Sequence, residues 1–239
     1  MALKSIVFED KKFDISYEIL NQNQTKTLVF LHGWGSNKDI MKQAFAPYLK
    51  GFKHIYIDMP GFGKSQNSYV LTTFDYANIV KEFLKELNCE VIAVFGHSFG
   101  GKVATLLNPK NLILLSSAGI LEKKPLKVKL KIFSAKLLNL LGLKNFTKIF
   151  RSKDVNLMSE NMYKTFKNVV DEDFSKYFED FSNNALIFWG EKDSATTLAS
   201  GEKIAKLIKN SKFVSYSQDH YFFLQNAADI SKRVENGIS

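Results

Sequence analysis

The chain has 239 residues, 45% of them hydrophobic and 24% charged, which fits one large globular domain and excludes a disordered chain. Its single cysteine, Cys89, excludes both an internal disulfide framework and a cysteine-based zinc site. The net charge is +9, but among the 33 basic residues only Arg151 and Arg233 are arginines. Because arginine is the residue that reads phosphates and base edges, this lysine excess does not indicate nucleic-acid binding.

The N-terminal segment carries no recognisable targeting signal. Its short apolar run ends at Glu9 and Asp10, well before the length of a secretory signal core. No stretch of the chain approaches the ~18 apolar residues that a membrane-spanning helix needs. We therefore expect a soluble cytoplasmic protein without a transmembrane segment.

Short apolar runs alternate with longer stretches of helical spacing, which is typical of a mostly parallel sheet with helices on both faces. The runs at 3–8 and 13–20 predict an opening hairpin with its turn at 10–12. Compact apolar runs predict six further strands, at 27–31, 54–57, 91–95, 112–116, 185–189 and 212–216. Helical spacing marks 39–50, 74–87 and 202–209, and Thr72 and Thr73 are candidate caps of the second helix.

One region interrupts this alternation. Between 119 and 184 no convincing strand occurs, and apolar residues recur at helical spacing, namely Leu126, Leu130, Phe133, Leu137 and Leu141. A structureless loop of this length is implausible in a compact domain. The sequence therefore predicts a core made of residues 1–118 and 185–239, with a helical insertion at 119–184.

The strongest motif is the segment Gly-His-Ser-Phe-Gly-Gly at 96–101, directly after the predicted strand 91–95 and before a helical stretch. It has the form G-x-S-x-G, in which a serine projects from a strained turn between a strand and a helix. Gly96 and Gly100 then need minimal side chains, and the start of the helix directs backbone N–H groups toward a developing oxyanion. Ser98 is therefore a candidate nucleophile. The alternative is a glycine-rich turn that only binds phosphate or packs closely.

With this motif the chain resembles the α/β-hydrolase fold family, in its serine hydrolase branch. His-Gly-Trp-Gly at 32–35 follows a predicted strand and is similar to the HGxxG oxyanion loop of the family. The resemblance implies that the backbone N–H groups of Trp34 and Phe99 form the oxyanion hole. The segment 58–65 is similar to the D-x-P-G-x-G-x-S turn of the family, and we expect a structural role there.

A serine nucleophile needs a general base that is oriented by a carboxylate. Of the four histidines, His32 belongs to the oxyanion loop, His54 opens a strand and His97 lies inside the serine motif, so His220 remains. His220 follows the last strand, where the family places its base. The segment 188–193 resembles the family's W-G-x-x-D signature and makes Asp193 the candidate acid, with Glu191 as a less favoured alternative. The order Ser98, Asp193, His220 agrees with the fold. No proline follows Asp193 at 194–197, and 217–219 lacks the glycines that usually precede the base, so the local match is imperfect.

The resemblance implies a hydrolase that cleaves a carboxylic ester or thioester of a small to medium acyl group through an acyl-enzyme, with neither cofactor nor metal. The serine disfavours the dehalogenase and epoxide hydrolase branches, which use aspartate. The chain also resembles C–C bond hydrolases of the 2-hydroxy-6-oxo-dienoate type. This resemblance implies that the insertion is a lid, and Arg151 is the only arginine in it. The segment 32–35 is similar to that of pimeloyl-carrier-protein methyl ester esterases. A catalytically idle relative that binds a small molecule is a further alternative.

The positive charge is concentrated in this predicted lid. Residues 119–153 contain one acid, Glu122, and ten basic residues, which are Lys123, Lys124, Lys127, Lys129, Lys131, Lys136, Lys144, Lys148, Arg151 and Lys153. The difference of nine equals the net charge of the whole chain. We expect a solvated face, and the alternative is a landing site for an acidic partner, such as an acyl carrier protein, or for an anionic lipid surface.

Overall fold

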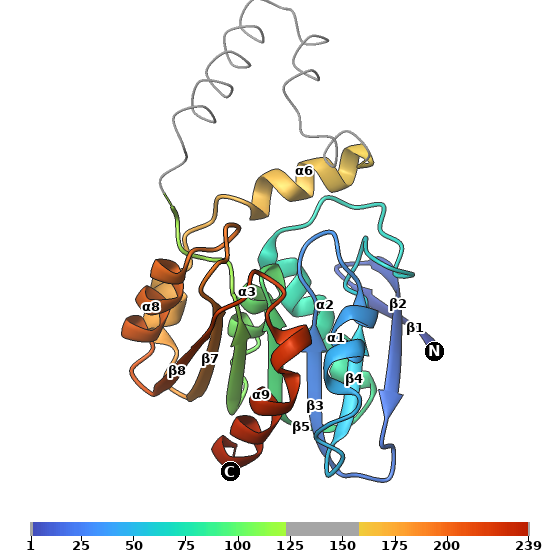
Figure 1. The fold of residues 1–239 in the computed structure, drawn as a ribbon. Coiled ribbons are helices and arrows are strands. Elements are labelled where there is room, and N and C mark those ends of the chain that lie inside the picture. Colours follow the sequence, from blue (N-terminus) through green and yellow to red (C-terminus); the bar gives the residue numbers. More distant parts are fainter. Residues whose placement is uncertain (1, 123–157, 239) are drawn as a thin grey trace, which may run out of the picture.

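The computed structural model describes residues 2–122 and 158–238, and within these residues eight strands form one sheet (Figure 1). The order across the sheet is β1-β2-β4-β3-β5-β6-β7-β8. β2 pairs antiparallel with β1 and β4, whereas the remaining neighbours are parallel. The strands are β1 (Ala2–Phe8), β2 (Lys11–Leu20), β3 (Lys26–Leu31), β4 (Lys53–Ile57), β5 (Glu90–His97), β6 (Asn111–Leu115), β7 (Asn184–Gly190) and β8 (Ser211–Tyr216). This confirms the predicted mostly parallel sheet.

The central strands are buried on both faces, which explains why they read as continuous apolar runs. The hairpin turn, however, lies one residue earlier than the sequence predicted. Phe8 pairs with Lys11, so the turn consists of Glu9 and Asp10, with φ angles of 49° and 59°. A two-residue turn with positive φ at both positions matches the twist of the two strands, so β2 begins directly at Lys11.

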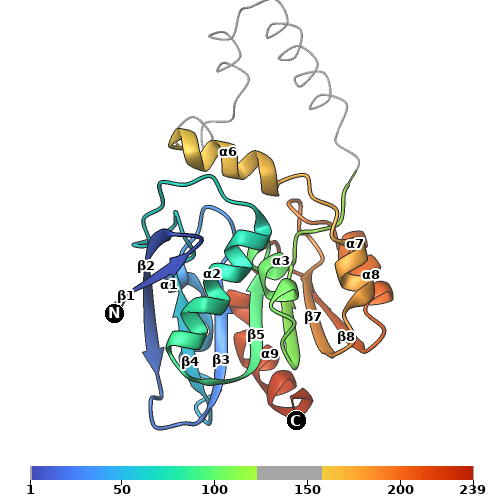
Figure 2. The ribbon, with the colours of Figure 1, turned by 180° about the vertical axis from the view of Figure 1, so that it is seen from behind.

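Helices cover both faces of the sheet. On one face α1 (Lys38–Phe45) and α9 (Phe223–Gly237) pack side by side, and on the other lie α2 (Thr73–Glu86), α3 (Phe99–Leu106), α7 (Ser175–Asp180) and α8 (Leu198–Leu207) (Figures 1 and 2). Each face has its own buried apolar cluster, which the sheet separates. The prediction of helices on both faces is confirmed.

Two helices differ clearly from their predicted limits, and a third was not predicted. α1 ends at Phe45 rather than at residue 50, because a turn follows in which Leu49 has φ 54°. α8 begins at Leu198, four residues before the predicted start, where the carboxylate of Glu122 accepts a hydrogen bond from the Thr197 N–H at 2.8 Å. That capping partner is remote in sequence, so the local pattern could not indicate it. α9 was not predicted.

The described part of the predicted insertion contains α6 (Glu160–Val169) and α7. α6 lies across the carboxyl ends of the strands in both views (Figures 1 and 2). Its Thr165 hydroxyl accepts a hydrogen bond from the Leu71 N–H at 3.0 Å, so α6 is fastened to the loop before α2. The basic segment 123–153, with Arg151 and the apolar series at 126–141, falls outside the described residues. The limits 119–184 of the insertion therefore stay a prediction.

None of the helices within 2–122 and 158–238 has both the length and the hydropathy to span a bilayer.

Candidate active site

Ser98 occupies a sharp turn between β5 and α3, at the carboxyl edge of the sheet. Its backbone has φ 50° and ψ −114°, a conformation that L-residues rarely adopt. The Ser98 N–H donates to the Leu115 carbonyl at 3.1 Å, and its carbonyl accepts from the N–H groups of Gly101 and Ala118 at 2.9 and 3.0 Å. These bonds hold the strained residue in place, and its side chain remains partly exposed. The strand–turn–helix context predicted for this serine is therefore present.

The two glycines that flank Ser98 are required by close backbone contacts. A Cβ atom on Gly96 would lie 2.4 Å from the carbonyl oxygen of Gly100. A Cβ atom on Gly100 would lie 2.6 Å from the carbonyl oxygens of Leu31 and His32. Real Cβ atoms do not show contacts this short, so a larger residue at either position would force the surrounding backbone to shift.

The segment 32–35 follows β3 and lies beside Ser98. A Cβ atom on Gly33 would come 3.2 Å from the Cβ atom of Ser98, which shows how closely the two segments approach. The imidazole of His32 anchors the loop, because Nδ1 donates to the Gly33 carbonyl at 2.7 Å and Nε2 accepts from the Met59 N–H at 3.1 Å. Among the described residues neither the Trp34 amide nor the Phe99 amide donates a hydrogen bond, so both are available to a ligand.

Asp193 and His220 meet at the ends of β7 and β8. The Nδ1 atom of His220 lies 2.6 Å from Oδ2 of Asp193. The carboxylate only accepts, so Nδ1 carries the proton and Nε2 is left with a lone pair. Burial acts to raise the pKa of Asp193, but hydrogen bonds from His220 and the Thr196 N–H outweigh it and lower this pKa to about 2. Asp193 is therefore ionised at neutral pH and orients His220.

The structure does not join all three predicted residues by hydrogen bonds. Within the described residues no hydrogen bond links the Ser98 hydroxyl to His220, and His97, the neighbour of Ser98, contacts the His220 ring at a centroid distance of 4.5 Å. A serine hydroxyl rotates freely, and catalytic hydrogen bonds often tighten only when a substrate is bound. The Ser98 turn and His220 are therefore neighbours through the ring of His97, and the described residues show no direct hydrogen bond between Ser98 and His220.

The remaining contacts of Asp193 were not predicted from the sequence. Its Oδ1 atom accepts from the N–H groups of Ala195 and Thr196 at 2.8 and 2.9 Å, and Oδ2 accepts from the Thr196 hydroxyl at 2.9 Å. These bonds hold the turn that follows Asp193, in which no proline occurs. Glu191, the alternative acid, instead accepts from the Ser215 hydroxyl at 2.7 Å and is exposed.

The segment 58–65 has the structural role that the sequence predicted. The buried carboxylate of Asp58 accepts from the Lys38 N–H at 2.7 Å and from its ammonium at 2.6 Å. The Ser65 hydroxyl donates to the Asp58 carbonyl at 2.6 Å and closes the turn. These bonds fix Phe62, whose ring meets Trp34 edge-on at 4.8 Å.

A cavity of about 640 Å³ lies between the segment 32–35, the turn 58–65 and the start of α6. Most of its wall is apolar, and it is lined by Trp34, Gly35, Gly61, Phe62, Met158, Ser159 and Met162. The Trp34 ring also packs against Phe99 and Phe166 at 5.5 and 5.4 Å. The sequence did not predict α6 as part of this wall, because only the fold brings residues 158–166 to the oxyanion loop.

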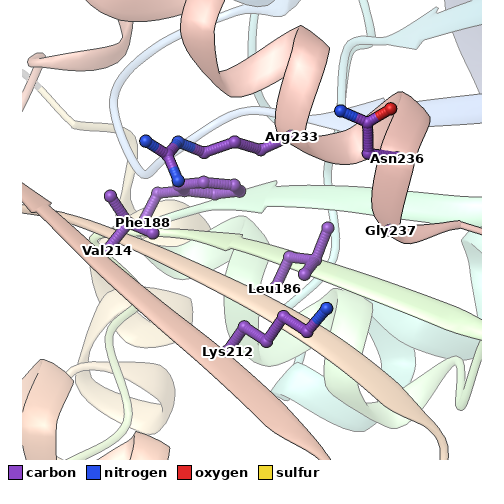
Figure 3. Close-up of a pocket in the computed structure, with 7 residues that line it drawn as sticks. All are labelled: Leu186, Phe188, Lys212, Val214, Arg233, Asn236 and Gly237. Carbon is purple, nitrogen blue, oxygen red and sulfur yellow. The ribbon is translucent and has the colours of Figure 1, made fainter.

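A smaller cavity of about 240 Å³ lies on the α9 face of the sheet, between β7, β8 and the end of α9 (Figure 3). Its lining contains none of the predicted site residues, and its arginine, Arg233, is already paired with Asp229 at 2.7 Å. No group of three or more His, Cys, Asp or Glu side chains that could hold a metal ion occurs within 2–122 and 158–238. The first cavity adjoins the Ser98 turn, because its lining residue Trp34 packs against Phe99, the residue that follows Ser98.

Comparison with known proteins agrees with the fold described above. Residues 26–117 match the family model described as alpha/beta hydrolase fold. The uncharacterized hydrolase YugF of Bacillus subtilis is 24% identical, with 86% of each chain covered. The pimeloyl-[acyl-carrier protein] methyl ester esterase of Wigglesworthia glossinidia brevipalpis is 29% identical over 79% of this chain and 69% of that protein. The solved esterase EaEST of Exiguobacterium antarcticum superposes with a TM-score of 0.73 at 22% identity, covering 94% of this chain and 95% of that one.

Proposed function

Because this chain belongs to the α/β-hydrolase superfamily and is a hydrolase of that fold, we propose that it cleaves carboxylic esters or thioesters through Ser98, His220 and Asp193. The observation that carries the proposal is the 2.6 Å contact between His220 Nδ1 and Asp193, in the site that contains the strained Ser98 turn. A carboxylate–imidazole pair beside a serine on such a turn is the arrangement that activates a hydroxyl nucleophile.

In the acylation step the Ser98 hydroxyl attacks the carbonyl carbon of the substrate. The Nε2 lone pair of His220 takes the hydroxyl proton, because Nδ1 is protonated and faces Asp193. The tetrahedral intermediate then collapses, and the imidazolium gives its proton to the departing alcohol or thiol. Water attacks the acyl-enzyme in the same way and releases the carboxylic acid. Asp193 stabilises the imidazolium at both stages without itself becoming protonated.

The negative oxygen of the intermediate needs donors that are in place before the reaction. The amides of Trp34 and Phe99 meet this requirement, because Phe99 opens α3 and neither amide donates a hydrogen bond within the described residues. The ring contact of 5.5 Å between Trp34 and Phe99 supports a fixed spacing of these two donors. We assign both amides to the oxyanion hole.

The adjoining cavity supports an acyl group as the bound part of the substrate. More than half of its wall is apolar, through Trp34, Phe62, Met158 and Met162, and its volume of about 640 Å³ is that of a small-molecule site. Thioether side chains adapt to ligands of different shape, which favours acceptance of several chain lengths. A small to medium acyl ester or thioester fits this wall best.

A carrier-linked methyl ester is a second candidate substrate. The observation that favours it is the match, over 79% of this chain, to a pimeloyl-[acyl-carrier protein] methyl ester esterase. The basic segment predicted to receive an acidic carrier lies almost wholly outside the described residues. Hydrolysis of a carrier-bound methyl ester and of the corresponding free methyl ester should therefore be compared directly, and equal rates would argue against a role for the carrier.

Hydrolysis of p-nitrophenyl acetate, butyrate, hexanoate and octanoate tests the main proposal. We expect turnover by the wild type with a maximum at an intermediate chain length, and loss of turnover in Ser98→Ala. Glu191→Gln is the matched control, since this neighbouring carboxylate contacts Ser215 rather than His220 and its loss should leave the rate unchanged. Equal rates for the wild type and Ser98→Ala would refute the proposal.

A further inference from the structure

His97 is the last residue of β5 and directly precedes Ser98, yet the mechanism above does not use its side chain. The side chain is 1% exposed. Its Nε2 atom lies 3.1 Å from the carbonyl oxygen of His220, and the two imidazole rings have a centroid separation of 4.5 Å. His97 therefore contacts both the backbone and the ring of the proposed general base.

The same side chain also contacts the oxyanion loop. A Cβ atom on Gly33 would lie 3.0 Å from Nδ1 of His97 and 3.2 Å from Cβ of Ser98. His97 thus lies between three parts of the site, which are the loop at 32–35, the nucleophile turn and the base. A residue in this position can fix how these parts are spaced.

The contacts define which nitrogen of His97 is protonated. A carbonyl oxygen only accepts hydrogen bonds, so Nε2 of His97 must be the donor to His220. Nδ1 is then unprotonated, and it is buried without a hydrogen-bond partner in the described part of the chain. Protonation of Nδ1 would place an unpaired cation in a dry position, so His97 is neutral.

The surroundings keep His97 neutral through the reaction. Burial first, and then the positive charge of His220, lower the pKa of His97 to about 3, against a smaller opposing effect of Asp193 and the His220 carbonyl. His32, the other imidazole acting on it, adds to the lowering. When His220 takes the serine proton, a neutral neighbour at 4.5 Å does not repel the imidazolium, whereas a second cation would.

We infer that His97 is a positioning residue for the general base, which holds the His220 backbone through its Nε2–H and stays uncharged beside the imidazolium. The inference rests on the proposed function, because it assigns a role in placing His220 against Ser98. It differs from a role in substrate binding, since His97 does not line the cavity formed by Trp34, Phe62 and Met162.

Two substitutions separate the hydrogen bond from the packing. His97→Phe keeps a ring but removes the donor, and His97→Gln keeps a donor at a similar reach without a titratable group. Losing one intramolecular hydrogen bond that orients a reacting group corresponds to a rate loss of about tenfold. We expect His97→Phe to lower kcat about tenfold with KM unchanged, and His97→Gln to recover most of that loss.

His54→Gln is the matched control. His54 is likewise a buried histidine on a central strand, with Nε2 donating to the Leu49 carbonyl at 2.9 Å, but its bonded partners, Leu49 and Tyr56, are not part of the site. Its substitution should lower the unfolding midpoint and leave kcat unchanged. If His97→Phe, His97→Gln and His54→Gln instead change kcat only in proportion to their unfolding midpoints, the inference is overturned.

A measurement on the wild type covers the case in which His97→Phe does not fold. Imidazole proton–nitrogen correlation NMR should show one buried histidine, absent in His97→Gln, with a protonated Nε2 and a bare Nδ1 that does not titrate in the neutral range. A protonated Nδ1 would overturn the inference. Failure of the proposed function is distinguishable from both outcomes, because in that case the wild type itself would not hydrolyse esters.

Discussion

His32 should make the protein lose stability on mild acidification. Both ring nitrogens of this fully buried side chain are engaged, with Nδ1–H donating to the Gly33 carbonyl and Nε2 accepting from the Met59 N–H. A proton added at Nε2 would remove the acceptor of Met59 and leave a buried cation. Burial is the main cause that lowers the pKa of His32 from 6.5 to about 4, although its bond to Gly33 and the charge of Asp58 oppose this.

The direction and size of the effect follow from this lowered pKa. The unfolded chain binds a proton at His32 once the pH falls below 6.5, while the folded chain resists until about 4. Stability is therefore complete above 6.5 and falls through that window as the pH is lowered. A shift from 6.5 to about 4 corresponds to at most about 3 kcal/mol, of which about 2 kcal/mol is already lost at pH ~5.

Denaturant unfolding of the wild type and of His32→Gln at pH ~8 and pH ~5 measures this contribution. Glutamine does not titrate, so the variant should lose about 2 kcal/mol less than the wild type between the two conditions. The other buried histidines are present in both proteins and largely cancel in this comparison, because His32 is only the smallest of the influences on His97. Identical losses in the two proteins would refute the assignment of His32 as a buried neutral anchor.

Three further substitutions test other parts of the structure. Gly100→Ala should destabilise the protein by about 1–3 kcal/mol in denaturant unfolding, because its Cβ would lie 2.6 Å from two backbone oxygens; wild-type stability would contradict this. Asp193→Asn should lower kcat about a thousandfold or more with little change in KM, since His220 loses the partner that sets its tautomer. Steady-state kinetics measures both constants, and a loss of kcat below tenfold would contradict the assignment of Asp193. Lys102→Met should lower the free energy of unfolding by about 3 kcal/mol, because the ammonium of this buried lysine donates to the Val169 carbonyl and, at 2.9 Å, to the Glu172 carboxylate. A variant whose thermal unfolding midpoint equals that of the wild type would contradict this prediction.

The strands could be predicted because each buried run carries its own signal. β3 and β5 to β7 are buried on both faces and read as apolar runs whatever their partners are. The exact hairpin turn could not be read, since Glu9-Asp10 lacks the glycine that usually marks a two-residue turn with positive φ. α9 carried a readable signal that was missed, with Phe223, Ala227, Ile230 and Val234 recurring at helical spacing on its buried face.

The candidate site was predictable only as far as local motifs reach. Short sequence motifs and the order of the residues along the chain predict the Ser98 turn and the pair of Asp193 and His220. The contacts of Asp193 with Thr196 use a backbone N–H and a common hydroxyl, which no motif records. The bond from His97 to the His220 carbonyl joins residues 123 positions apart, so only the fold reveals it.

Covalent labelling by a fluorophosphonate tests the central claim most directly. This probe reacts with serines that are activated as nucleophiles, so its adduct reports the site without knowledge of the substrate. The account predicts one adduct per chain in intact mass spectrometry, mapped to the peptide containing Ser98 and absent in Ser98→Ala. An unlabelled wild-type protein, or an adduct that persists in Ser98→Ala, would contradict it.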